Sequence, residues 1–175
     1  MMNDIIKAMI ERRSIRDFKP DMPEKEDLEQ IIEAGLYAAN GMGTQDPIIV
    51  AVTDKAVRDR LSQINGRILG EEGSDPFYGA PVIFIVLSRS DWRNRVYDGS
   101  LVIGNMMLAA HSLGLGSIWI NRAKQEFEMP EWKEFLSDIG IKGEWEGIGH
   151  CAVGYMNCEL PKPPERKPGR VYWVE

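Results

Sequence analysis

The chain has 175 residues, 43% of them hydrophobic, and its 27 acidic and 21 basic residues give a formal charge of −6. This length closes one core, so we expect a single domain over residues 1–175. The acidic balance excludes a broad basic surface for nucleic acid or an anionic membrane, although it leaves room for a local basic pocket. Cys151 and Cys158 are too few for a disulfide framework or a four-ligand zinc site.

Helical and extended patterns alternate in the first half of the chain. Apolar residues at helical spacing predict amphipathic helices over residues 3–12 and 24–39. The β-rich run at 48–54 predicts a short strand, and residues 55–69 return to helical spacing. The nearly all-apolar run at 82–88 predicts a central strand that is buried on both faces.

The second half begins with an unusually apolar helix. Residues 98–113 are apolar on almost every side, which is typical of a helix buried in a core or against a partner subunit. A short strand is predicted at 117–120, a weaker helix at 130–138 and a last strand at 147–155. Residues 159–175 hold four of the ten prolines and should be extended. Their VYWV ending favours an arm that lies across another surface over a loose tail.

Residues 11–18 read ERRSIRDF and place three arginines around Ser14, namely Arg12, Arg13 and Arg16. One interpretation is that these cations complement the dipole at a helix C-terminus, which contributes ~0.3–1 kcal/mol each. The other is an anion site, because guanidiniums and a hydroxyl offer donors suited to a phosphate. Arg166 and Lys167 in the C-terminal segment can complete such a site.

The stretch ANGMGTQ, residues 39–45, has two glycines and no bulky branched side chain, so its backbone can approach a flat ligand closely. The alternative is a plain connection between a helix and a strand. The chain has neither a phosphate-binding loop with Lys-Ser or Lys-Thr nor a G-x-G-x-x-G after a strand, which disfavours nucleotide sites of those kinds.

The remaining polar candidates give little support to acid–base hydrolysis. His111 and His150 lie in apolar segments, where a lone histidine is more often a satisfied core residue than a catalyst. Asp91 and Asp98 can be proposed as paired carboxylates, but we expect such charges to be solvated. Trp119 follows a glycine turn and is either core or a residue that stacks on a ring.

Taken in order, these pieces resemble the FMN-dependent nitroreductase family. The matching segments are ERRSIRDFKPDMPEKEDLEQIIEAG, AANGMGTQDPIIVAVTD, GNMMLAAHSLGLGSIWI, GHCAVGY and PPERKPGRV. The resemblance implies an α+β fold, with a mixed or antiparallel sheet flanked by helices. It also implies an intertwined homodimer with extended C-terminal arms and one FMN in each of two interface clefts.

The resemblance also implies which residues hold FMN. The phosphate would be bound by Arg12, Arg13, Ser14 and Arg16, joined by Arg166 and Lys167 of the arm. The flavin ring or ribityl chain would be lined from the partner subunit by Asn40, Gly41, Met42 and Gln45. The backbone around Ile120 and Asn121 would run along the ring and donate a hydrogen bond near N5. No side chain is expected to act as catalyst and no metal is expected.

The expected function is a cytoplasmic oxidoreductase. It would transfer a hydride from NAD(P)H through flavin N5 to a nitroaromatic, a quinone or another small acceptor by a ping-pong mechanism. One alternative is a specialised flavin enzyme of the same family, dehalogenase-like or flavin-fragmenting. Others are a non-catalytic flavin- or anion-binding module and a structural dimeric domain. Neither nucleic acid nor a membrane is expected as a partner.

Overall fold

The computed structural model describes residues 2–175 and is built around one four-stranded sheet. The strand order is β1-β2-β4-β3, and each neighbouring pair is antiparallel. The sheet therefore has β1 and β3 as its edges. The strands are β1 (Ile48–Val52), β2 (Val82–Arg89), β3 (Gly116–Ile120) and β4 (Trp145–Gly154).

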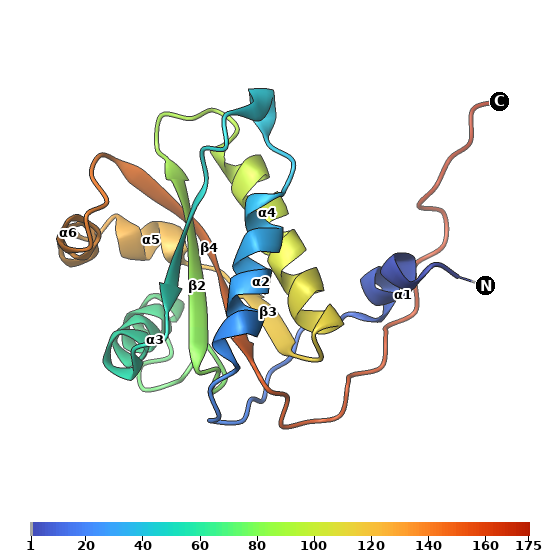
Figure 1. The fold of residues 1–175 in the computed structure, drawn as a ribbon, viewed down its shortest axis with the longest axis horizontal. Helices are drawn as coiled ribbons and strands as arrows, with labels where there is room; N and C mark the ends of the chain where they lie inside the picture. The colour runs from blue at the N-terminus through green and yellow to red at the C-terminus, as the bar shows by residue number, and fades with distance from the viewer. Residues whose placement is uncertain (1) are drawn as a thin grey trace.

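Helices cover both faces of the sheet (Figure 1). α2 and α4 pack together on one face, while α3, α5 and α6 lie on the other. The helices are α1 (Asp4–Glu11), α2 (Lys25–Leu36), α3 (Lys55–Leu69), α4 (Arg95–Ser112), α5 (Ala123–Phe127) and α6 (Pro130–Asp138), with a short 3-10 turn η1 (Gly41–Gly43).

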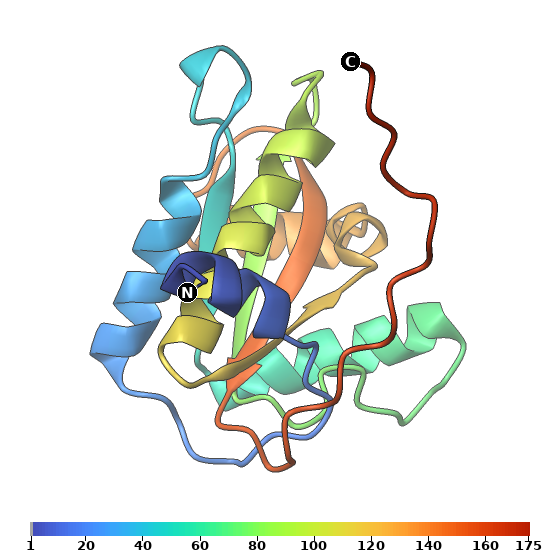
Figure 2. The same ribbon diagram turned by 90° about the vertical axis from the view of Figure 1, so that its right-hand side faces the viewer.

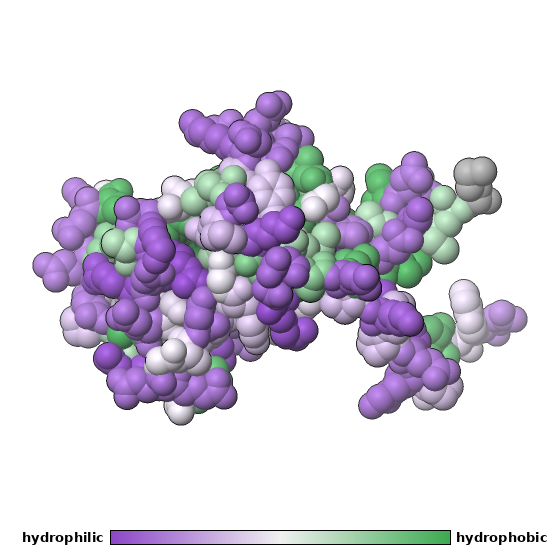
Figure 3. Space-filling model, turned by 90° about the horizontal axis from the view of Figure 1, so that it is seen from below, coloured by the Kyte–Doolittle hydropathy of each residue, from purple (hydrophilic) through white to green (hydrophobic). Residues whose placement is uncertain are grey.

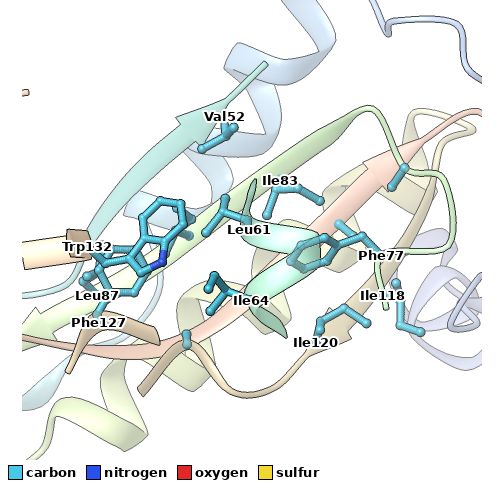
Figure 4. Close-up of a cluster of buried hydrophobic side chains, with 14 of the residues drawn as sticks. Val52, Leu61, Ile64, Phe77, Ile83, Leu87, Ile118, Ile120, Phe127 and Trp132 are labelled. Atoms are coloured by element: carbon cyan, nitrogen blue, oxygen red, sulfur yellow. The ribbon is translucent and has the colours of Figure 1, made fainter. Parts of the chain in front are cut away.

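The central strand β2 contributes side chains to the hydrophobic cores on both faces of the sheet. Successive side chains of a strand point to opposite faces, so Ile83 and Ile85 join the core beneath α3, whereas Phe84 and Val86 join the core beneath α2 and α4. Figure 4 shows the first of these cores, where Trp132 of α6 packs with residues of α3 and β2. Every residue from 82 to 88 is buried, which confirms the predicted central strand.

Several helices differ from the sequence-based predictions. α2 ends at Leu36 and not near residue 39, because the Tyr37 and Ala38 N–H groups close the last turn and the chain then enters η1. α4 begins at Arg95, three residues earlier than expected, with no side-chain cap to signal its start. The short helix α5 was not predicted, since five residues are too few to show a helical period.

Both chain ends stand apart from this body (Figures 1 and 2). α1 lies near the C-terminal part of α4 and has no buried residue. Residues 157–175 are exposed throughout and extended. Apolar side chains gather on the projecting α1 in Figure 3. The exposed apolar side chains of the two ends are Ile5, Ile6, Met9 and Ile10, and Val171, Tyr172, Trp173 and Val174.

The two cysteines lie in contrasting surroundings. Cys151 is fully buried in β4, and Cys158 is exposed where the C-terminal arm begins. Burial raises the pKa of the Cys151 thiol to about 12, against a smaller opposing effect of the positive charge on Arg12. Within residues 2–175, no helix is both long and apolar enough to cross a bilayer.

Candidate functional site

The segment after α1 runs along the outer edge of β3. The Ile15 N–H donates to the Ser117 carbonyl at 3.1 Å, and Ser14 forms an isolated parallel bridge with Ser117. Ile15 is buried and anchors the segment. Alternate residues of an extended chain face opposite sides. Ser14 and Arg16, which flank Ile15 in the sequence, are therefore directed away from the core.

The structure gives the three arginines of this segment different surroundings. Arg13 donates from Nη1 to the carbonyls of Ile10 and Arg12, each at 2.6 Å, so it caps the end of α1 as the helix-end interpretation expects. Among residues 2–175, the Arg12 guanidinium has a single hydrogen-bond partner, the sulfur of Met107 at 4.0 Å, and Arg16 is exposed.

None of these guanidiniums forms an ion pair with a carboxylate within the described part of the chain. In addition, the buried Nε of Arg13 has no hydrogen-bond partner there. Uncompensated cations around a serine hydroxyl fit an anion that brings its own acceptors.

The far end of β3 presents backbone groups to the same edge. The Ser117 carbonyl points outward to Ile15, and by strand alternation the backbone polar groups of Trp119 point outward as well. Asn121 follows directly, and its side-chain oxygen accepts from the Trp119 indole at 2.7 Å. Ser117 and Asn121 are four residues apart, or about 13 Å along a strand. The edge of β3 thus joins the arginine segment at one end to the Ile120–Asn121 backbone at the other.

The loop of residues 39–45 is held at the opposite end of α4. The Gly41 N–H donates to Oδ1 of Asp98 at 2.9 Å, and the Trp92 indole donates to Oδ2 at 2.7 Å. A Cβ on Gly41 would lie 2.2 Å from the amide end of the Asn94 side chain, so a larger residue here would require that side chain to move. Met42 has a positive φ of 58° and an 81% exposed side chain. Strained backbone that projects an apolar side chain is a feature of ligand sites.

Asp98 corrects one expectation from the sequence. The sequence predicts a solvated charge, yet Asp98 is 3% exposed and holds both the loop and Trp92. The sequence signal is its position in the first turn of a helix that is otherwise apolar, where a carboxylate also complements the helix dipole.

Asp46, directly after the loop, is a second buried carboxylate. It accepts hydrogen bonds from Ser88 and from the backbone and side chain of Arg89. Burial raises its pKa, but the hydrogen bonds from Ser88 and Arg89 and the Arg89 charge outweigh this, so the pKa lies below its usual value.

One copy of the chain does not bring all the expected site residues together. Gly41 is tied to Asp98 and Arg12 contacts Met107, and these α4 positions are nine residues apart. The loop and the arginine segment are therefore about 14 Å apart along the helix axis. They lie toward opposite ends of α4 in Figure 1.

Within residues 2–175, the arm cations form no hydrogen bond with the arginine segment. The guanidinium of Arg166 donates to the carbonyl of Pro164, at 2.8 and 3.2 Å from its two nitrogens, and Lys167 is exposed. The arm does begin beside this segment, because Asn157 contacts Asp17 and Met156 bridges Phe18. The part of Arg166 and Lys167 in the site stays a prediction. No group of three or more histidine, cysteine or acidic residues within 2–175 is arranged to hold a metal ion.

Comparison with known proteins gives consistent results. The model of the Nitroreductase family matches residues 9–155. The crystal structure of a nitroreductase with bound FMN from Bacteroides fragilis NCTC 9343 is 29% identical, with a TM-score of 0.91, and the match covers 99% of this chain and 100% of that one. A nitroreductase with bound FMN from Desulfitobacterium hafniense DCB-2 is 27% identical, with a TM-score of 0.87, over 100% of both chains.

A curated relative is similar over much of its length. The Bacillus subtilis strain 168 protein named "FMN reductase NAD(P)H" is 25% identical over 170 aligned positions, and the match covers 80% of this chain and 66% of that protein. The family model spans most of the chain, and the fold agrees with both crystal structures from end to end. This chain therefore belongs to the nitroreductase family.

Proposed function

We propose that the protein is an FMN-dependent oxidoreductase that takes a hydride from NAD(P)H and passes two electrons to a small acceptor, such as a nitroaromatic or a quinone, in a ping-pong cycle. The observation that carries the proposal is the pair of uncompensated guanidiniums, Arg12 and Arg16, beside the open edge of β3. The bound FMN and the names of the similar proteins support it.

The residues present fit FMN chemically. A phosphate dianion would satisfy Arg12, Arg16 and the Ser14 hydroxyl, and the unpartnered Nε of Arg13 lies in the same segment. The flavin ring would then follow the edge of β3 toward Ile120 and Asn121. Arg166 and Lys167 would join the phosphate when the arm docks.

The chain itself supplies position and electrostatics. When bound, FMN supplies the redox chemistry, with N5 as the atom that accepts the hydride. The Asn121 N–H is a backbone donor that would face the edge of the flavin ring, and preorganised dipoles of this kind stabilise charge that develops during a reaction. Trp119 would flank the ring on the β3 side.

The complete site requires a second copy of the chain. Asn40, Gly41, Met42 and Gln45 are separated from the arginine segment of their own subunit by about 14 Å along the axis of α4, so they would line the flavin bound by the partner. A homodimer would also cover the apolar faces that one copy leaves open. These faces are on α1, on the arm and along the stripe of α4 formed by Tyr97, Leu101, Gly104 and Leu108.

The first test is the visible absorption of purified protein before and after incubation with FMN and removal of the excess. We expect flavin bands that persist, and oxidation of NADH or NADPH when menadione or a nitroaromatic is added. Arg12→Ala should weaken FMN binding tenfold or more, since a hydrogen bond to a charged group contributes about 1.5–3 kcal/mol.

The matched control is Arg67→Ala, because Arg67 is an exposed arginine of α3 away from the edge of β3. It should leave FMN binding unchanged. Protein that retains no FMN would refute the proposal. Protein that holds FMN but oxidises no NAD(P)H with any acceptor would leave only a flavin-binding module.

A further inference from the structure

A fully buried acid–base pair lies beneath the end of β3. Glu126 of α5 and His150 of β4 are both 0% exposed, and Oε2 of Glu126 lies 2.7 Å from Nε2 of His150. Neither atom has another hydrogen-bond partner within residues 2–175. Burying two ionisable groups is costly unless the environment satisfies them, so the surroundings of this pair are informative.

Asn65 of α3 connects the pair to the β3 end. Its side-chain amide donates to Oε1 of Glu126 at 2.5 Å and to the Asn121 carbonyl at 3.0 Å. Its oxygen accepts from Nε of Arg122 at 2.7 Å. Asn65 is 0% exposed. One buried side chain therefore bonds both the acid and the residues that end β3.

His150 reaches the same stretch of backbone from the other side. Its Nδ1 is 3.3 Å from the Ile120 carbonyl oxygen. Phe77 packs edge-on against the imidazole, with 5.3 Å between the two ring centroids. Because a carbonyl oxygen only accepts, Nδ1 must carry a proton to bond it. A second proton then lies between Nε2 and Glu126, which fixes the orientation of the ring.

These contacts determine where two backbone N–H groups point. Residues 2–175 contain no cis peptide bond, and in a trans peptide the C=O and the following N–H point in opposite directions. The Ile120 carbonyl is drawn inward to His150, so the Asn121 N–H points outward. The Asn121 carbonyl is held by Asn65, so the Arg122 N–H points away from Asn65.

The backbone at this point is also strained. Arg122 has a φ of 81° in the left-handed region, which is unfavourable for a residue with a side chain. Such a conformation persists only where surrounding contacts enforce it, and the bond from the Arg122 guanidinium to Asn65 is one of them.

We propose that Asn65, Glu126 and His150 are positioning residues, which aim the Asn121 and Arg122 N–H groups at the edge of the bound flavin and thereby set its reduction potential. This inference rests on the proposed function. The three residues lie beneath the backbone and need not touch FMN. Their effect is to hold donors in place before the flavin is reduced.

The main test is the two-electron reduction potential of bound FMN in Asn65→Leu. Leucine has a similar volume but removes the donor to the Asn121 carbonyl. We expect reduced FMN to lose about tenfold in affinity relative to oxidised FMN, which lowers the potential by about 30 mV for a two-electron couple. The matched control is Ser62→Ala, one turn earlier on α3, where a buried side chain bonds Asp75 and not β3. It should leave the potential unchanged.

The Glu126→Gln variant distinguishes a positioning role of Glu126 from a direct effect of its negative charge on the potential. Its amide oxygen can still accept from Asn65, and its amide N–H can donate to a neutral His150 that keeps its Nδ1 proton. A positioning role predicts that the affinity for reduced FMN relative to oxidised FMN changes less than threefold from wild type. A shift as large as that of Asn65→Leu would overturn the proposal in favour of a direct effect of the Glu126 charge.

A measurement on protein without FMN keeps the inference separate from the proposed function. We would record the ¹H–¹⁵N shifts and the hydrogen exchange of the Asn121 and Arg122 amides. Asn65→Leu should change both amides, whereas Glu126→Gln and Ser62→Ala should not. If wild type binds no FMN, the proposed function fails and these amides still test the positioning role. Unchanged amides, or an unchanged potential in folded Asn65→Leu, would overturn the inference while the oxidoreductase proposal stands.

Discussion

The body of the molecule and its two chain ends differ in how completely they satisfy their own side chains. In the sheet and its covering helices, apolar residues such as Phe84 and Trp132 are fully buried. In α1 and the arm, apolar residues such as Ile5 and Trp173 are exposed. A single copy therefore contains a self-sufficient core and two segments whose apolar surface requires another contact. Stability and site assembly are therefore separate properties of this chain and can be tested separately.

The largest expected effect is in the core. Trp132→Ala should lower the free energy of unfolding by about 3–5 kcal/mol, because it deletes a fully buried aromatic side chain. Trp173→Ala, at a residue 83% exposed in one copy, should change the unfolding of the isolated subunit by less than about 0.5 kcal/mol. Urea denaturation at low protein concentration measures both. Equal losses would break the distinction between body and ends.

The next effect concerns the arm. Deleting residues 159–175 should convert the proposed homodimer to a monomer and weaken FMN binding about a hundredfold, since exposed aromatics buried on association carry much of the binding energy. Light scattering after gel filtration and FMN fluorescence titration measure the two changes. The thermal unfolding of the body should persist. A truncated chain that stays dimeric and binds FMN normally would show that the arm is dispensable.

A smaller effect divides the arginines. Arg16→Ala should weaken FMN binding about tenfold, because it removes one charge-assisted donor. Arg13→Ala should weaken FMN binding less and should reduce the helicity of α1, whose last carbonyls Arg13 caps. Fluorescence titration and circular dichroism separate the two. If Arg13→Ala has the larger effect on FMN, the assignment of Arg13 to the helix end is wrong.

The smallest effect is a dependence on pH at the junction of the loop and the body. The folded pKa of Asp46 lies below its usual value. Its contribution is therefore fully present above the unfolded pKa of about 3.9 and is lost as the pH falls through the folded pKa. Asp46→Asn should remove this part of the acid sensitivity and lower stability near pH 7 by roughly 1 kcal/mol.

Urea denaturation between pH 2 and pH 7 measures this contribution. The exposed Asp138→Asn serves as control. An unchanged pH profile in Asp46→Asn would contradict the assignment.

The sequence predicts the body well because its elements carry strong periodic patterns. The spans of α3 and α6 agree with the prediction, and the apolar run at 82–88 identifies β2 as a central strand. The sequence does not reveal α5, which is too short for a period. That omission matters, because Glu126 lies in α5 and His150 consequently looked like a lone core histidine. Its partner becomes visible only when the chain folds.

The sequence predicts the separate segments of the candidate site, but it does not predict how the fold arranges them relative to one another. The composition of residues 11–18 indicates an anion site, but only the fold shows that Arg13 turns back to its own helix. The bond between Gly41 and Asp98 joins residues 57 positions apart, which no local pattern contains. The distance between residues 39–45 and Arg12 is likewise a property of the tertiary structure. In the proposed homodimer, the pairing of subunits would decide which copy each contact comes from.

The contrast between the two thiols gives the protein a built-in attachment point. Thiol reagents attack the thiolate, so the buried Cys151, with its pKa of about 12, is inert in the folded state. Cys158 is exposed at the root of the arm. A maleimide fluorophore added to wild-type protein will therefore label Cys158 alone. Each chain then carries one optical reporter at the start of its arm, without any engineered residue.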